Sequence, residues 1–182
     1  MLDVGAGSGY FTSVCYHLVR SSAQQQQQQQ GGGTVVVGIE HIPALTALAE
    51  QNIRADGLGT AIDDEQGIVL VTGDGRLGVS ISSNQITQKI NCLLCWSWSD
   101  LAGYAQKGPY DAIHVGAAAR TIPPALVEQL ASPGRMIIPV GTYSQRLMQV
   151  DKDAQGKITQ RDLFGVVVRT PCPLLDQTPP KC

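Results

Sequence analysis

Three glycines at alternate positions, Gly5, Gly7 and Gly9, directly follow the short run Met1–Val4. Glycine lets the backbone turn sharply and lets a ligand approach the main chain, and a helix that starts after such a turn has N–H groups without partners. A strand, a glycine turn and a helix in this order are typical of nucleotide sites in α/β proteins. The spacing therefore predicts that residues 5–9 bind a nucleotide-like ligand.

Three acidic side chains stand at or near the ends of expected strands: Asp3, Glu40 and Asp74. Asp3 can accept hydrogen bonds from loop amides and meet a cationic amino group, directly or through water. Glu40 can accept from ribose hydroxyls, while Asp74 can accept from an adenine amino group and the Gly75 amide can donate to a ring nitrogen. Each acid alone also fits a cap or a turn. Because the carboxyl ends of parallel strands share one edge of a sheet, we expect the three to converge on one adenosine-shaped site.

The glycine spacing distinguishes between two nucleotide-like ligands. A dinucleotide fingerprint has its third glycine two residues after the second and usually no acid on the first strand. Here Asp3 precedes a tighter Gly-x-Gly-x-Gly pattern, which favours S-adenosylmethionine as the cofactor and disfavours a dehydrogenase. Glu40 falls later than the usual ~20 residues after the glycines, but removal of the tract at 21–33 would restore that spacing.

The elements that must position these residues form a βαβ pattern of an α/β fold. We expect a Rossmann-like, mostly parallel, doubly wound sheet with an antiparallel hairpin at its C-terminal edge. Apolar runs and helical periodicity predict strands at 1–4, 34–40, 68–72, 110–116 and 135–140, helices at 10–20, 43–55 and 123–130, and hairpin strands at 146–151 and 162–169.

The length of 182 residues with 43% apolar side chains suits a single domain over residues 1–182. Two segments within this domain differ in composition or periodicity from the rest. Residues 21–33 contain seven consecutive glutamines and three glycines, and we expect a solvent-exposed low-complexity insertion there. Residues 79–103 have weak periodicity and carry both tryptophans, Trp96 and Trp98, and we expect an atypical insertion with these as apolar filler.

Composition excludes several function classes. With 13 basic and 15 acidic residues and a net charge of −2, the chain lacks the positive electrostatic potential that would attract nucleic acid or an anionic membrane. No apolar run approaches the roughly 20 residues needed to span a bilayer, and the N-terminus lacks a signal-peptide pattern, so we expect a cytoplasmic monomer. Five cysteines, an odd number, indicate reduced thiols, and the lone pair Cys92 and Cys95 is too little for a metal site, so we expect no metal.

Five blocks of the chain resemble the protein-L-isoaspartate O-methyltransferase family: Leu2–Tyr10, Val37–Ile42, Gly73–Gly78, Tyr110–Ala119 and Pro133–Gly141. The runs His114–Ala117 and Gly73–Arg76 are particular to this group. The resemblance implies methyl transfer from S-adenosylmethionine to the carboxylate of L-isoaspartyl residues, with damaged proteins or peptides as substrates. The cofactor-binding residues are then expected to be Asp3, Gly5, Gly7, Ser8, Gly9, Glu40, His41, Asp74, Gly75 and Arg76.

The chemistry needs no strong base, because a carboxylate is already a nucleophile and a sulfonium is already activated. We therefore expect no catalytic residue in the sense of a proton-transfer group. His114 and Asp111 are interpreted as packing and loop-organising groups.

The chain also departs from the family pattern. Relatives carry a segment before the first strand with a Ser-Ala-Pro-His type motif that has no counterpart here, and Leu175 stands where a threonine is usual. We expect an incomplete or imperfectly spliced sequence, with 79–103 an unremoved stretch and turnover weak or absent. Two alternatives stay open: a non-catalytic S-adenosylmethionine-binding remnant, and a methyltransferase with another acceptor.

Overall fold

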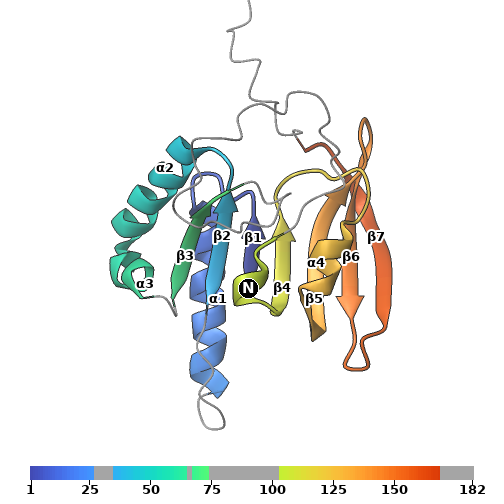
Figure 1. Ribbon diagram of the computed structural model, residues 1–182, viewed down its shortest axis with the longest axis horizontal. Helices are drawn as coiled ribbons and strands as arrows, with labels where there is room; N and C mark the ends of the chain where they lie inside the picture. The colour runs from blue at the N-terminus through green and yellow to red at the C-terminus, as the bar shows by residue number, and fades with distance from the viewer. Residues whose placement is uncertain (27–34, 65–66, 74–102, 169–182) are drawn as a thin grey trace, which may run out of the picture.

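The computed structural model of the chain describes residues 1–26, 35–64, 67–73 and 103–168 (Figure 1). Within these ranges a seven-stranded sheet has the order β3-β2-β1-β4-β5-β6-β7. Its elements, in chain order, are β1 Leu2–Val4, α1 Tyr10–Gln26, β2 Val36–Glu40, α2 Pro43–Ile53, α3 Gly59–Asp63, β3 Ile68–Thr72, β4 Tyr110–Val115, α4 Pro124–Glu128, β5 Leu130–Val140, β6 Gln145–Lys152 and β7 Ile158–Val166.

The sheet is parallel from β3 to β5 and antiparallel from β5 to β7. This confirms the predicted α/β class, the mostly parallel sheet and the antiparallel hairpin at its C-terminal edge. The strand order reverses beside β1, because the chain continues to β2 and β3 on one side and later adds β4 and β5 on the other. In open α/β sheets, ligands bind outside the carboxyl ends of the strands at such a reversal.

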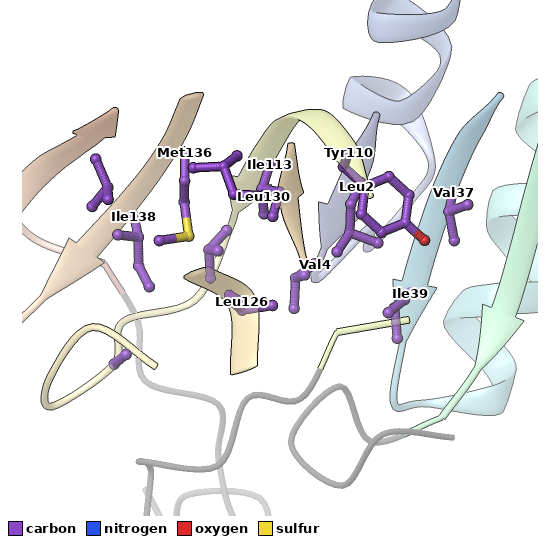
Figure 2. Close-up of a cluster of buried hydrophobic side chains, with 13 residues drawn as sticks. Leu2, Val4, Val37, Ile39, Tyr110, Ile113, Leu126, Leu130, Met136 and Ile138 are labelled. Carbon is purple, nitrogen blue, oxygen red and sulfur yellow. The ribbon is translucent and has the colours of Figure 1, made fainter. Parts of the chain in front are cut away.

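The two faces of the sheet bury different cores. Leu2 and Val4 of β1 point into the larger core, which lies on the face that carries Leu126 of α4 (Figure 2). On the opposite face, Cys15 and Tyr16 of α1 pack in a second core with residues from α2, α3 and the strands beneath. Since side chains alternate along a strand, Asp3 faces α1.

The first helix is longer than its periodicity predicts. The expected helix ended at residue 20, whereas α1 continues to Gln26 and so takes in the first part of the tract assigned to an insertion. Glutamine and alanine have high helix propensity, so a polar stretch can extend a helix that is already anchored by its apolar residues. The rest of that tract, residues 27–33, lies outside the described residues.

The helix expected over 43–55 ends earlier and is followed by a helix that was not predicted. Helix α2 stops at Ile53, and the chain then makes a wide turn over Arg54–Leu58 in which Gly57 has a φ of +80°. The positive φ of Gly57 changes the direction of the chain at one residue, and helical backbone then resumes as α3. Asp56 and Gly57 therefore mark a bend between two helices.

Element bounds also differ in the C-terminal half. Helix α4 ends at Glu128, and β5 already begins at Leu130, so the helix predicted to residue 130 was too long and the strand predicted from 135 too short. In the hairpin, β7 starts at Ile158 instead of 162. Its turn closes early because Asp153 Oδ1 accepts from the backbone N–H groups of Gln155 and Lys157, at 2.9 and 2.8 Å.

Several predicted features lie outside the described residues: the segment 79–102 with both tryptophans, and the cysteines other than Cys15. Gly103, the last residue of the expected insertion, is described and buried. In the described ranges, no helix has the length and apolar character needed to cross a membrane.

Lys152 links the antiparallel part of the sheet to α4. Its Nζ donates to the backbone carbonyls of Leu130 and Val127, at 2.9 and 3.4 Å. We expect Lys152→Met to lower the free energy of unfolding by about 1–2 kcal/mol, because both carbonyls lose a charged donor. Urea denaturation measures this. The matched control, Lys157→Met in the exposed hairpin turn, should leave stability unchanged, and an equal loss in both variants would contradict the assignment.

Candidate functional site

The loop between β1 and α1 has a backbone that only glycine adopts easily. Gly5, Gly7 and Gly9 have φ values of +88°, +55° and +79°. This is the left-handed region, which costs other residues about 1–2 kcal/mol each. The N–H groups of Gly5 and Ala6 both donate to the carbonyl of Ile39, at 2.8 and 2.9 Å, which fastens the loop to the end of β2.

The glycines differ in what surrounds them. A Cβ on Gly9 would lie 2.9 Å from the Cβ of Ala49, so this glycine lets α1 begin directly against α2. A Cβ on Gly7 would meet nothing closer than 4.0 Å, so the main chain is open there. The carbonyl of Ser8 accepts from Asn52 Nδ2 of α2 at 2.9 Å, which adds a second link between loop and helix. The loop is thus fixed at Gly9 and accessible at Gly7.

Glu40 ends β2 with a buried carboxylate that faces the loop. Its Oε2 accepts from the Gly7 N–H at 2.9 Å. Its Oε1 accepts from the N–H groups of His41 and Ile42, at 2.8 and 3.1 Å, and lies 2.9 Å from His41 Nδ1. The structure therefore brings Glu40 and His41 to the glycine loop, as the sequence predicts for the ends of neighbouring strands.

Asp3 occupies a different environment, because it is fully buried beneath the loop. Its Oδ2 accepts from Thr12 Oγ1 at 2.7 Å, and its Oδ1 lies 2.8 Å from His114 Nδ1. An ionised carboxylate only accepts, so this histidine nitrogen carries the hydrogen. The sequence also allows Asp3 to accept from loop amides, but the Gly7 amide donates to Glu40.

His114 packs as well as pairs. Its imidazole centroid lies 4.2 Å from that of the Phe11 ring, with the planes tilted by 48°. The packing predicted for His114 is confirmed by this contact, whereas Asp111, which was interpreted in the same way, is exposed. Sequence reasoning missed Thr12 and Phe11. The available signal was the position of Asp3 between two apolar residues, which turns its side chain toward the first turn of α1.

The convergence of all three acids is only partly visible. Asp3 and Glu40 lie on adjacent strands, and Asp3 pairs in register with Gly38, two residues before Glu40. Asp74, Gly75 and Arg76 lie outside the described residues. The preceding residue, Gly73, donates its N–H to the carbonyl of Glu40 at 3.0 Å, so the chain leaves β3 beside Glu40. In the part of the chain that is described, no group of three His, Cys, Asp or Glu side chains could hold a metal ion.

Cys15 lies in the second core, and burial together with the nearby charge of Asp3 raises the pKa of its thiol to about 11. At pH 8 only about one thiol in a thousand is then the reactive thiolate. We expect iodoacetamide to leave Cys15 unmodified at pH 8 in the folded chain and to alkylate it in guanidinium, as measured by peptide mass spectrometry.

The same shift has a consequence for stability. The pKa of Cys15 in the folded chain lies above the usual thiol value of 9.0, so its contribution to the free energy of unfolding is fully present below about pH 9 and is lost as the pH rises toward 11. Equal alkylation rates in the folded and unfolded chain at pH 8 would contradict both the burial and this loss.

A protein-family model matches most of this chain. The family model for protein-L-isoaspartate(D-aspartate) O-methyltransferase (PCMT) matches residues 1–86 and 82–171. The two matches overlap at residues 82–86, within the segment 79–103 that is expected to be an insertion.

Similar proteins carry the same family name. A protein-L-isoaspartate O-methyltransferase of Triticum aestivum is 38% identical over 161 residues, which are 88% of this chain and 54% of that protein. One of Caenorhabditis elegans is 38% identical over 168 residues, 91% of this chain and 57% of the relative. The chain thus spans about half the length of the curated relatives it matches.

A solved structure supports the fold. The crystal structure of a beta-aspartate methyltransferase (PCMT) from Plasmodium falciparum, in complex with S-adenosyl-L-homocysteine, matches with a TM-score of 0.61 at 24% identity. The match covers 93% of this chain and 63% of that one. Taken with the family-model match, the glycine loop and the strand order, these likenesses place the chain in the protein-L-isoaspartate(D-aspartate) O-methyltransferase family.

Proposed function

We propose that this chain transfers the methyl group of S-adenosylmethionine to the carboxylate of L-isoaspartyl residues in damaged proteins. Family membership supports the reaction class, and the names of the relatives supply the isoaspartyl acceptor. The S-adenosylhomocysteine in the Plasmodium falciparum structure supports the choice of donor. We also propose that residues 1–182 act as one domain, since the described strands join one sheet.

The observation that carries donor binding is the pairing of Glu40 with the open glycine. Glu40 Oε2 accepts one hydrogen bond, from Gly7, among the described residues, and a carboxylate oxygen has capacity for two. A ribose hydroxyl can therefore bind to Oε2 without displacing the loop. Because a Cβ at Gly7 would have no neighbour closer than 4.0 Å, the donor can also approach the main chain.

The remaining donor-site residues follow from their positions. Gly5, Ser8 and Gly9 shape the loop, and His41 lies against Glu40 at the end of β2. Asp3 belongs to the site through the elements it joins, because the loop runs between β1 and α1. We propose that three residues beyond β3 complete the site, although they lie outside the described residues: Asp74, Gly75 and Arg76.

The bound donor supplies an activated methyl group, which leaves its sulfonium for a substrate carboxylate oxygen and yields a methyl ester and S-adenosylhomocysteine. The chain needs to hold the methyl group and the acceptor oxygen in line. Holding two reactants in the correct geometry can by itself accelerate a reaction greatly. A carboxylate acceptor is already ionised near neutral pH, so we propose no proton-transfer residue.

Two measurements on the full chain test this proposal. Isothermal titration calorimetry with S-adenosylhomocysteine should show saturable binding. A methylation assay should show transfer to an isoaspartyl peptide and none to the same peptide with normal aspartate. Binding without transfer would identify a donor-binding remnant, and transfer to both peptides would identify another acceptor. A folded chain that does not bind S-adenosylhomocysteine would overturn the proposal.

A further inference from the structure

We propose that Thr12 and His114 are positioning residues: they hold the buried carboxylate of Asp3, and through it they fix the Gly5–Gly9 loop in the shape that binds the methyl donor. The inference rests on the proposed function for the identity of the donor. It assigns a role to two side chains that lie beneath the loop and outside the expected donor-binding set.

The contacts connect three elements through one carboxylate. Asp3 lies on β1, two residues before Gly5, and Thr12 lies in the first turn of α1, three residues after Gly9. The Thr12 hydroxyl donates to Oδ2 and the His114 imidazole donates to Oδ1, at 2.7 and 2.8 Å. One end of the loop is thereby tied to its other end, and both are tied to β4.

Burial makes these contacts consequential. Asp3 has no solvent exposure, so its carboxylate depends on protein donors to replace water. Removal of either donor leaves a buried charge with an unsatisfied oxygen, which costs more than the hydrogen bond itself contributes. β1 and β4 are held by backbone pairing, Leu2 with Ile113 and Val4 with Val115. We therefore expect the glycine loop and the first turn of α1, and not these strands, to take up the loss of a donor.

The surroundings fit both donors closely. Gly38, the register partner of Asp3 on β2, has no side chain, and a Cβ there would lie 3.1 Å from Thr12 Oγ1. On the other side, the Phe11 ring packs on the His114 imidazole. The buried Thr12 hydroxyl therefore has little room for another orientation, and the imidazole is held by its contact with Phe11 and its hydrogen bond to Asp3. A supporting group that is held in this way can fix a site precisely.

Paired substitutions separate the hydrogen bond from the bulk of each side chain. His114→Asn places an amide N–H close to the position of Nδ1, whereas His114→Leu keeps an apolar side chain without a donor. Thr12→Ser keeps the hydroxyl and Thr12→Val removes it with little change in volume. Each variant is measured for S-adenosylhomocysteine affinity by calorimetry and for amide hydrogen exchange of residues 5–9.

We expect His114→Leu and Thr12→Val each to weaken S-adenosylhomocysteine binding by about tenfold and to speed exchange in the loop. The His114→Asn and Thr12→Ser variants should stay within about twofold of wild type in affinity. Two matched controls should change neither quantity: His17→Leu, on the exposed side of α1, and Thr46→Val, whose hydroxyl donates to the carbonyl of Ile42, the residue before α2.

The two readouts keep the proposals distinguishable. If wild type does not bind S-adenosylhomocysteine but loop exchange still rises in Thr12→Val and not in Thr12→Ser, the proposed function fails and the positioning role stands. The positioning role is overturned if Thr12→Val keeps wild-type exchange and affinity, or if it loses only thermal stability. Thr12→Val removes a single hydroxyl and so decides the question even if His114→Leu does not fold.

Discussion

The Glu40→Gln variant is expected to bind S-adenosylhomocysteine about 100-fold more weakly than wild type. Glu40 accepts N–H groups on both carboxylate oxygens, from Gly7 on one and from His41 and Ile42 on the other. A glutamine has one accepting oxygen, so its NH₂ must face an N–H on one side. The loop then loses an anchor and the ribose hydroxyl loses an ionised acceptor, and about 1.5 kcal/mol for each accounts for the 100-fold loss. Calorimetry measures the change.

Glu50→Gln is the matched control for this variant. Glu50 lies on the exposed face of α2 and pairs with Arg54, one turn away, at 2.9 Å. Exposed pairs of this kind contribute little, so affinity and stability should stay at wild-type values. A Glu40→Gln variant that binds as tightly as the Glu50→Gln control would show that the carboxylate at the end of β2 does not contribute to donor binding.

Gly9→Ala should lower the free energy of unfolding by about 3 kcal/mol, from two causes. The first is the left-handed backbone, with a φ of +79°. The second is contact, because the added Cβ would lie 2.9 Å from the Cβ of Ala49 and 3.1 Å from its carbonyl oxygen. These atoms are the backbone and the Cβ of Ala49, which cannot rotate away, so α1 and α2 must move apart. Urea denaturation of wild type and variant measures the loss.

Gly156→Ala separates the two causes. Gly156 has a φ of +80°, nearly identical to that of Gly9, but an added Cβ would meet nothing within 4 Å. This variant should therefore lose only the backbone part, about 1–2 kcal/mol. If the two variants were equally destabilised, the close approach of α1 and α2 at Gly9 would carry no energetic weight.

The parts of the fold that sequence predicted best are those with a simple local cause. The run from residue 68 to 72 has β-branched side chains at every position except Leu70, and β3 has these bounds. The ends of the helices were predicted less accurately, because they depend on tertiary contacts. Helix α4 stops before Leu130, since that residue is buried in the core and pairs with Tyr110 of β4. A helical pattern in the sequence does not record such a partner.

The site divides in the same way. Glu40 could be placed because its contacts are made by the next two residues and by a loop anchored to the same strand. The partners of Asp3 could not, because His114 lies 111 positions away and meets it only through the register of β1 with β4. Register between distant strands is set by the whole sheet. The local pattern gave the face on which Asp3 lies but not the side chains it meets there.

The 111-residue separation between Asp3 and His114 also bears on how the chain folds during synthesis. A ribosome must extend the polypeptide past β4 before the central strand has neighbours on both sides and before its acid acquires the imidazole donor. Contacts that close such long loops form late and slowly. A nascent chain that contains only β1, α1 and β2 would have to bury Asp3 without that donor. We therefore expect the first half of the sheet to lack stable structure until β4 docks.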